Sequence, residues 1–277
     1  MKLETWLILL TAALLLGQAA PSVPKPVKIM RLDCGTFVAN DLDGFNDTGA
    51  MKGRGAPLTS SCYLIRHGDD YMIWDTGISA EAKGKPLNQT AAFDFTLKAT
   101  LVEQLATLGI KPAQVTRVGV SHYHFDHTGQ AASFPTATLL IGKGDLDALK
   151  AGAPGVDAKP VAPWVTGGGK VDAITGDKDV FGDGAVTMID LPGHTPGHHG
   201  LMVRLAKRGT LLLTGDQAHF QENYDSNGVP RFNVNRADTL ASFDRFKGLA
   251  KVSKATVIIQ HDSRDLGKLP AFPNWAD

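Results

Sequence analysis

The sequence predicts an α+β fold built in layers rather than a parallel, doubly wound sheet. Of its 277 residues, 43% are hydrophobic and 20% are charged, which is the composition of a globular chain with a large core. Runs that indicate hairpins alternate with runs of helical spacing, and this mixture argues against a purely parallel sheet. We expect one domain over residues 20–277, because that length suits a single large core.

The expected strands are short apolar runs separated by turn residues. They lie at residues 27–32, 61–66, 71–74, 115–120, 137–141, 186–191, 201–205, 210–213 and 255–259. Short turns join the second run to the third and the seventh to the eighth, so each of these pairs predicts a hairpin. We expect His67, in the first of these turns, to be solvated.

Helical spacing of apolar residues predicts two longer helices, over residues 95–108 and 237–250. Asp238 or Thr239 is the expected cap of the second helix. Between the first two strands, residues 40–57 are rich in Gly, Asp and Asn and predict a long loop, a type of segment that often carries function. Phe45 and Met51 in this loop are candidates for an apolar lid.

Residues 1–19 have the pattern of a secretory signal peptide, with a basic start, an apolar run and small residues at a cleavage site. The apolar run is shorter than the ~20 residues that a membrane-spanning helix needs, so we expect export and no stable membrane anchor. The mature protein is then periplasmic or secreted. An oxidising compartment permits a disulfide between Cys34 and Cys62, but both lie in apolar runs, and two buried thiols explain them equally well.

The formal net charge is zero, with 28 basic and 28 acidic residues. No global field therefore attracts nucleic acid or an anionic membrane, and we expect a small-molecule substrate and no nucleic acid. The oligomeric state is left open, and a homodimer remains one of the alternatives.

Four separate apolar runs end in residues that can bind a metal ion: His122, His194, Asp216 and His261. A buried strand holds the side chain at its end in a fixed place, so four such ends predict convergence on one cleft. The strongest local signal is HYHFDH at residues 122–127. His122 and His124 point the same way because strand side chains alternate, while Asp126 and His127 reach a second position from the following turn. A solvated polar turn is the alternative interpretation.

These residues resemble the motifs of the metallo-β-lactamase superfamily, whose signature is H-x-H-x-D-H. The resemblance continues in the expected order with IWDTG at 73–77, PGHTPGH at 192–198, LTGD at 213–216 and QHD at 260–262. It implies an αββα sandwich of the metallo-β-lactamase type with two divalent metal ions in a cleft at one edge. Zn²⁺ is the expected metal, although His and Asp ligands also accept Fe, Mn and Co.

The resemblance also implies the role of each residue. One metal would be held by His122, His124 and His194, the other by Asp126, His127 and His261, with Asp216 bridging the two. A hydroxide shared by the metals would attack a carbonyl, and Asp126 would pass a proton to the leaving oxygen. Asp75 would orient a ligand histidine from behind, with an Asx turn before Gly77 as the alternative. His198 would stabilise the loop after His194.

Within the superfamily, the pattern most resembles N-acyl homoserine lactonases and exported relatives, which implies a quorum-quenching hydrolase that opens a lactone ring. Many such lactonases carry a substrate-contacting tyrosine three residues beyond the bridging aspartate, where this chain has His219. We hypothesise that His219 donates a hydrogen bond to the substrate carbonyl. A β-lactamase is disfavoured by Asp216, because the most similar class usually lacks that bridge.

Other functions stay open on the same metal centre. An exported organophosphate hydrolase would use the same ligands, and a thioesterase of the glyoxalase II type would need a basic site that the sequence does not locate. A metal-binding protein without catalysis is the alternative of a different class. Structural zinc sites are usually closed and often contain cysteine, whereas the predicted donors are all His or Asp and leave positions for water and substrate, which favours catalysis.

Overall fold

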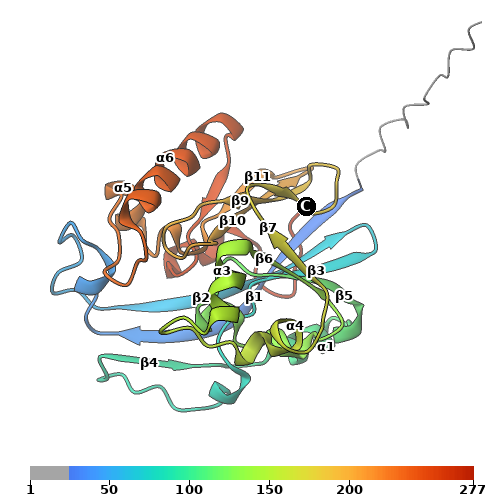
Figure 1. Ribbon diagram of the computed structural model, residues 1–277, viewed down its shortest axis with the longest axis horizontal. Coiled ribbons are helices and arrows are strands. Elements are labelled where there is room, and N and C mark those ends of the chain that lie inside the picture. The colour runs from blue at the N-terminus through green and yellow to red at the C-terminus, as the bar shows by residue number, and fades with distance from the viewer. Residues whose placement is uncertain (1–24) are drawn as a thin grey trace, which may run out of the picture.

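The structure, a computed structural model, describes residues 25–277 and contains two stacked β-sheets with helices on both outer faces (Figure 1). This arrangement confirms the predicted αββα sandwich. The expected signal peptide at residues 1–19 lies outside the described residues. Within the described part of the chain, no helix is long and apolar enough to cross a bilayer.

The larger sheet has the strand order β4-β1-β2-β3-β5-β6-β7 and the smaller one the order β12-β11-β10-β9-β8. The strands of the larger sheet are β1 (Val27–Ala39), β2 (Ala56–His67), β3 (Asp70–Trp74), β4 (Phe93–Thr96), β5 (Val115–Gly119), β6 (Thr138–Gly142) and β7 (Val171–Ile174). Those of the smaller sheet are β8 (Lys178–Asp179), β9 (Val186–Asp190), β10 (His199–Leu205), β11 (Gly209–Leu213) and β12 (Thr256–Ile258). The β2–β3 and β10–β11 pairs are antiparallel, which confirms both predicted hairpins.

The helices cover the sheets from outside. They are α1 (Leu101–Thr107), α2 (Phe125–Thr128), α3 (Lys143–Ala151), α4 (Ala162–Val165), α5 (Gln221–Ser226) and α6 (Arg236–Ser253). Strand side chains alternate between the two faces of a sheet, and this alternation explains the layers. On β1, Leu32 packs outward with Leu105 of α1, whereas Ile29 faces inward and packs with Val186 of the other sheet. Phe246 of α6 covers the far side of the smaller sheet.

The predicted helix over residues 95–108 is wrong in its first part. β4 instead pairs with the end of β1, and α1 begins only after Thr100. The Thr100 hydroxyl accepts a hydrogen bond from the Glu103 N–H at 3.2 Å, and the Glu103 carboxylate accepts one from the Thr100 N–H at 2.9 Å. This reciprocal cap sets the start of the helix, so the aromatic residues before it belong to an edge strand.

The predicted caps of the last helix are also wrong. Asn235 caps α6, because its side-chain oxygen accepts from the N–H groups of Ala237 at 3.0 Å and Asp238 at 3.3 Å. Thr239 is buried, and its hydroxyl donates to the Asn233 side chain at 2.9 Å.

Cys34 on β1 and Cys62 on β2 form a disulfide, with their Cα atoms 5.7 Å apart. Of the two alternatives that the sequence left open, the structure therefore has the disulfide. It links neighbouring antiparallel strands inside the outer core of the larger sheet.

His67 is buried, so the prediction that it is solvated is wrong. Its Nε2 atom lies 2.7 Å from Oδ2 of Asp183, and its ring stacks on Phe181 with the ring centroids 4.1 Å apart. The β2–β3 turn is therefore covered by the segment that precedes β9, a contact between residues distant in sequence.

Candidate metal centre

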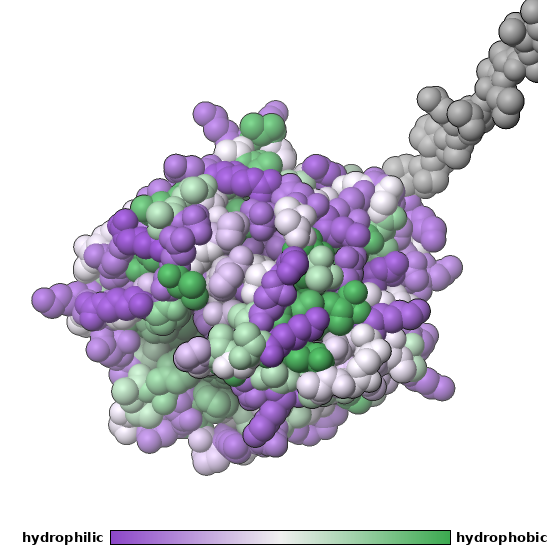
Figure 2. Space-filling model, viewed as in Figure 1, coloured by the Kyte–Doolittle hydropathy of each residue, from purple (hydrophilic) through white to green (hydrophobic). Residues whose placement is uncertain are grey.

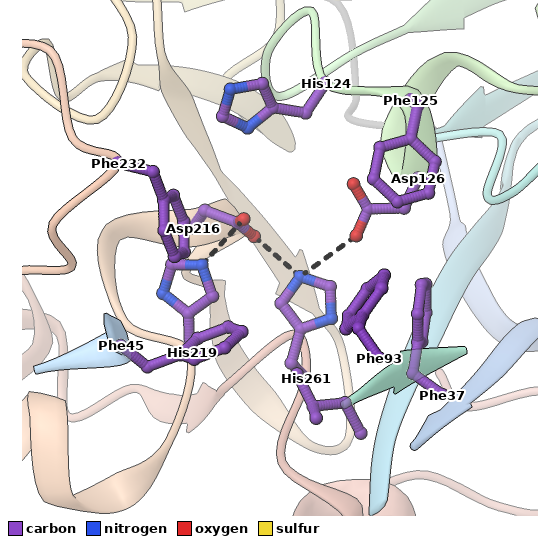
Figure 3. Close-up of a pocket in the computed structure, with 11 residues that line it drawn as sticks. Phe37, Phe45, Phe93, His124, Phe125, Asp126, Asp216, His219, Phe232 and His261 are labelled. Carbon is purple, nitrogen blue, oxygen red and sulfur yellow. Dashed lines mark hydrogen bonds and ion pairs between the residues drawn. The ribbon is translucent and has the colours of Figure 1, made fainter. Parts of the chain in front are cut away.

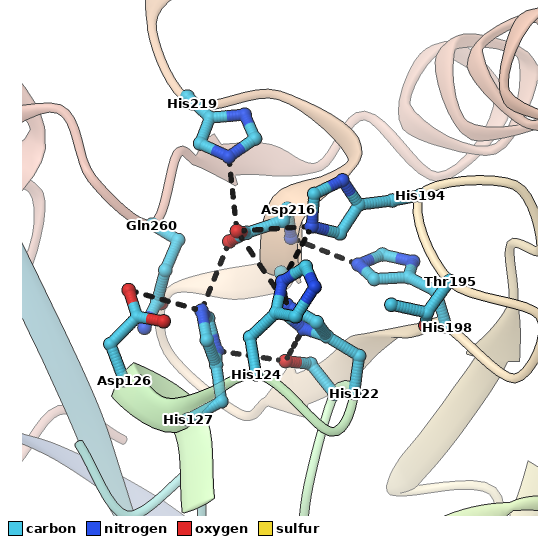
Figure 4. A network of polar contacts seen from close by, with 12 residues as sticks. His122, His124, Asp126, His127, His194, Thr195, His198, Asp216, His219 and Gln260 are labelled. Atoms are coloured by element: carbon cyan, nitrogen blue, oxygen red, sulfur yellow. Dashed lines mark hydrogen bonds and ion pairs between the residues drawn. The ribbon is translucent and has the colours of Figure 1, made fainter. Parts of the chain in front are cut away.

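The ends of four strands bring the predicted ligands into one site. β5, β9, β11 and β12 lead directly into the segments that carry His122, His194, Asp216 and His261. Each of these four side chains is at most 3% exposed. Figure 4 shows His122, His124, His127, His194 and His219 arranged around Asp216. The predicted convergence is therefore present in the structure.

The first group consists of His122, His124, His194 and Asp216, whose donor atoms all lie within 4.8 Å of one another. The Nδ1 atom of His124 lies 2.8 Å from Nε2 of His122 and 3.1 Å from Nε2 of His194. Three ring nitrogens thus converge on one point. Neutral imidazoles arranged in this way cannot all satisfy each other as hydrogen-bond donors and acceptors, whereas a shared cation satisfies all three lone pairs.

The second group consists of Asp126, His127 and His261, again within 4.8 Å of one another. Asp216 lies between the groups. Its Oδ1 atom is 3.2 Å from Nε2 of His127 and 3.0 Å from Nε2 of His261, while its Oδ2 atom is 3.4 Å from Nε2 of His194. One carboxylate oxygen faces each group, which is the geometry that a bridging ligand needs.

The donor atoms fit two divalent cations. Burial lowers the pKa of His122 and His194 well below the ordinary value of 6.5, so both imidazoles are neutral and able to bind a metal. Nε2 of His127 is buried, and none of the described residues forms a well-directed hydrogen bond with it, although Oδ1 of Asp216 lies 3.2 Å away. Burial opposes protonation of His127, but Asp216, Asp75 and Asp126 raise its pKa well above the ordinary value. The second group therefore has a negative field that would also attract a cation.

Asp75 contacts the donors from behind. One of its carboxylate oxygens lies 3.0 Å from Nδ1 of His127, and the other accepts from the Ser121 N–H at 2.6 Å. The Ser121 hydroxyl lies 3.0 Å from Nδ1 of both His122 and His127. Such contacts set the orientation of an imidazole, so that its other nitrogen faces the site. Sequence reasoning missed Ser121, although its position directly before His122 was a signal.

His198 lies behind Asp216. Its Nε2 atom accepts from the Asp216 N–H at 2.9 Å, and its Nδ1 atom donates to the Leu191 carbonyl at 3.0 Å. Burial lowers the pKa of His198 to about 3, so the ring stays neutral and can accept this bond. The side chain thus fixes the backbone at Asp216 rather than facing either group of donors.

Asp145, on the first turn of α3, is a second residue that sequence reasoning missed. It is fully buried and accepts three hydrogen bonds: from the Tyr123 N–H at 3.1 Å, the Thr195 hydroxyl at 2.8 Å and the Gly197 N–H at 2.6 Å. Tyr123 and Thr195 each adjoin a ligand histidine. Asp145 therefore joins the loop of His122 to the loop of His194. A Cβ atom on Gly197 would lie 2.5 Å from the Asp145 nitrogen, so only glycine permits this approach.

Four of the donors, His124, Asp126, Asp216 and His261, form the floor of a cavity of about 290 Å³. Its walls are apolar and include Phe45, whereas Met51 is buried in the core beside Leu58, so the prediction of Met51 as part of a lid is wrong. Figure 3 shows Phe45 and Phe232 on one side of the cavity and Phe93 and Phe37 on the other.

His219 lines the same cavity and is 2% exposed. Its Nε2 atom lies 3.0 Å from Oδ2 of Asp216, and its Nδ1 atom has no partner among the described residues. The structure thus brings His219 to the cleft beside the bridging carboxylate.

The comparisons with known sequences and with known structures point to the same protein family. The profile of the Metallo-beta-lactamase superfamily matches residues 55–252. The N-acyl homoserine lactonase AttM of Azorhizobium caulinodans is 31% identical over 236 residues, which cover 78% of this chain and 86% of that protein. The crystal structure of a quorum-quenching N-acyl homoserine lactone hydrolase superposes with a TM-score of 0.78 at 23% identity, covering 92% of this chain and all of that one. AidC, a dizinc quorum-quenching lactonase, superposes with a TM-score of 0.66 at 17% identity over 92% of this chain and 91% of its own.

The His and Asp side chains converge at the strand ends, as the motifs of this family predict. The sequence profile, the relatives and the sandwich architecture point to the same family. The chain belongs to the metallo-β-lactamase superfamily.

Proposed function

We propose that this protein is a binuclear metal-dependent hydrolase that opens a lactone ring, with N-acyl homoserine lactones as the first substrates to test. The observation that carries the proposal is one buried carboxylate, Asp216, placed between two groups of His and Asp donors at the floor of an apolar cavity. The curated relatives named N-acyl homoserine lactonases support the choice of a lactone.

Two Zn²⁺ ions are the proposed cofactors. His122, His124 and His194 would hold one, Asp126, His127 and His261 the other, and Asp216 both. A pair of such ions lowers the pKa of a water molecule and polarises a carbonyl oxygen. Seven His and Asp donors with no cysteine are the set expected of a centre that leaves positions for water and substrate.

Two side chains at the cavity surface would take part in the chemistry. The Asp126 carboxylate lies 3.6 Å from Nε2 of His261, borders the cavity and is 13% exposed. It could accept the proton of the attacking water and then pass that proton to the leaving alkoxide. His219, which lines the cavity beside Asp216, would donate a hydrogen bond to the substrate carbonyl. Equal kcat/KM for His219→Ala and the unchanged protein on the best lactone would remove His219 from the mechanism.

The apolar walls of the cavity favour a substrate with a neutral substituent. No Lys or Arg of the described residues lines it. β-Lactams and glutathione thioesters carry carboxylates, which would enter the apolar walls without a partner and so at a cost in free energy. A neutral phosphotriester does not have this problem, and an organophosphate hydrolase is therefore the second candidate.

We further propose that the protein acts outside the cytoplasm, in the periplasm or after secretion. The Cys34–Cys62 disulfide supports this location, because disulfides persist in oxidising compartments. Fractionation of the native host with sequencing of the mature N-terminus tests it, and recovery of the full-length chain from the cytoplasm contradicts it.

The function is tested with a panel of substrates on metal-loaded protein: an N-acyl homoserine lactone, nitrocefin and a phosphotriester. We expect the lactone to have the highest kcat/KM and chelation of the metal to abolish turnover. Preference for the phosphotriester would select the second candidate. Bound metal without turnover of any of the three would contradict a hydrolase and favour a metal-binding protein.

A further inference from the structure

Strand β2 supports two of the three ligands in the second group of donors. The Thr59 N–H donates to the His261 carbonyl at 3.2 Å, and Nδ1 of His261 donates to the Thr59 carbonyl at 2.9 Å. One residue further along the strand, the Ser60 hydroxyl donates to the Asp126 carbonyl at 3.0 Å. The positions of His261 and Asp126 therefore depend on β2, and Cys62 lies two residues beyond Ser60 on the same strand.

The turn after β3, residues 75–79, supports the remaining ligand. The N–H and the hydroxyl of Thr76 both donate to the His127 carbonyl, at 2.7 and 3.0 Å, and the Asp75 carboxylate contacts the ring of this histidine. Asp75 has a φ of 56°, a left-handed conformation that a residue other than glycine keeps only when its surroundings hold it there. The support of His127 is thus a turn that itself needs to be held in place.

The Cys34–Cys62 disulfide joins β2 to this turn. Cys34 is the bulged residue of β1, because the register with β2 shifts around it and leaves it without a partner in the ladder. Its carbonyl accepts a hydrogen bond from the Ile78 N–H at 3.1 Å. A Cβ atom on Gly77 would lie 2.4 Å from Cβ of Cys34 and 3.0 Å from its Sγ atom. The turn therefore packs directly on a residue that is covalently bonded to β2.

Neither cysteine reaches the surface of the protein. Both are 0% exposed and belong to the outer core of the larger sheet, beneath a surface whose face in Figure 2 is largely hydrophilic. Thiol–disulfide exchange needs contact between the attacking thiolate and a sulfur atom, so burial protects this bond in the folded protein. The disulfide is therefore a permanent part of the support and not a reversible switch.

The first group of donors has different supports. The His194 carbonyl accepts from the Val234 N–H at 3.2 Å, and Asp145 joins the two loops that carry the histidines of this group. The turn after β3 reaches the first group through Asp75, whose carboxylate accepts from the N–H and the hydroxyl of Ser121. Loss of the disulfide should therefore affect the first group less strongly than the second.

Resting on the proposed two-metal centre, we infer that the Cys34–Cys62 disulfide positions the ligands of the second metal ion. The bond fixes the distance between β2, which holds Asp126 and His261, and the turn that holds His127. Without the bond, the bulge at Cys34 is free to move away from β2 and to displace the turn that packs on it. Metal binding tolerates little displacement of a ligand, so the second ion is then bound more weakly, while the first keeps most of its affinity.

The test replaces both cysteines in Cys34→Ala/Cys62→Ala and titrates the Zn²⁺-loaded protein with a competing chelator. We expect one of the two dissociation constants to rise by about 10–100-fold and the other to stay within about threefold of its value in the unchanged protein. ¹⁵N NMR of the histidine rings identifies the weakened site, because the signals of His127 and His261 should reach their metal-free positions before those of the first group. Equal weakening of both ions, weakening of the first ion alone, or no weakening overturns the inference.

Two further variants separate positioning from a general loss of stability. Leu105→Ala removes a buried side chain of the same core cluster, on α1, and should lower the melting temperature without changing either dissociation constant. If Leu105→Ala weakened the second ion as strongly as loss of the disulfide, positioning by the disulfide would be wrong. Gly77→Ala keeps the disulfide but forces a methyl group against Cys34, so it should weaken the second ion selectively. This variant decides the question if the protein without the disulfide does not fold, and unchanged affinity in it overturns the inference.

Failure of the inference is distinguishable from failure of the proposed metal centre. Binding of fewer than two Zn²⁺ ions by the unchanged protein contradicts the centre itself. Two ions in the unchanged protein, with no selective loss in the variants, contradict only the role of the disulfide.

Discussion

The floor and the walls of the cavity are built in opposite ways. At the metal centre below the floor, His122 and His127 are fully buried, and Ser121 and Asp75 hold their rear nitrogens. In the walls, Phe93, Phe125 and Phe232 are about half exposed. The first two pack on Phe37 and Phe95, and Phe232 packs on Phe45, His194 and His219. The metal centre is therefore held by directed hydrogen bonds, while the walls offer apolar surface without directed contacts.

This difference indicates how the same centre can serve different substrates. Metal chemistry tolerates little displacement of a ligand, so its residues come from strand ends and are held by hydrogen bonds. Selection of an apolar substituent depends on surface area rather than direction, and loops and an edge strand are sufficient for it. Changes to the floor should therefore abolish metal binding, and changes to the walls should alter only KM.

The largest effect is expected from Asp216→Asn. Asparagine is neutral and keeps only one of the two carboxylate oxygens, so one of the two groups loses its oxygen donor. We expect less than the full metal content and kcat/KM reduced by more than about 100-fold. Metal analysis with single-substrate kinetics measures both. Asp190→Asn, a partly exposed aspartate at the end of β9, is the matched control. Retention of both metals in Asp216→Asn would contradict a bridging role.

The next effect is expected from Asp145→Ala, which leaves the N–H groups of Tyr123 and Gly197 without an acceptor. The two ligand loops then lose their common contact, and metal affinity should fall by about 10–100-fold. Asp145→Asn keeps one acceptor oxygen and should recover part of the affinity. Titration against a competing chelator measures the change. If Asp145→Ala lowered the melting temperature but left metal affinity intact, its role would be structural only.

A smaller effect is expected from Phe232→Ala. The variant removes part of an exposed apolar wall, worth about 1 kcal/mol or about fivefold in KM, while kcat and metal content stay unchanged. Steady-state kinetics with metal analysis tests this separation of wall from floor. Loss of metal from this variant would show that the wall residue also supports the metal ligands, and would contradict separate roles for the walls and the floor.

The smallest effect on the site is expected from His67→Ala, far from the cavity. We expect unchanged kinetics and a loss of about 1–2 kcal/mol in the free energy of unfolding. Burial opposes ionisation of Asp183, but the hydrogen bond from His67 holds its pKa below the ordinary 3.8. The bond therefore stabilises the fold above about pH 4, and this contribution is lost as the pH falls through the lowered pKa. When unfolding is measured from pH 3 to pH 7, the free energy of unfolding should fall less steeply toward acidic pH in His67→Ala than in the unchanged protein.

Much of the metal centre was predictable from the sequence because its residues lie at the ends of apolar runs. HYHFDH, His194, Asp216 and His261 each follow a strand, and the order of these strands was recognisable. The edge strand β4 was missed because its four residues run into apolar residues at helical spacing, so that Phe95 was counted with the helix. Only the pairing of β4 with β1 separates the two elements. The same holds for Asn235, whose role as a cap depends on where α6 begins.

The sequence by itself determined the layered fold, the set of His and Asp donors and the family, because these depend on local periodicity and on motifs that lie along the chain. Only the tertiary structure decided that Ser121 and Asp145 support the donors alongside Asp75, and which residues line the walls. The packing of segments far apart in sequence forms three such pairs: Ser121 with Asp75, Asp145 with Gly197, and His67 with Asp183. Such contacts depend on strand register and helix placement, which no local pattern specifies.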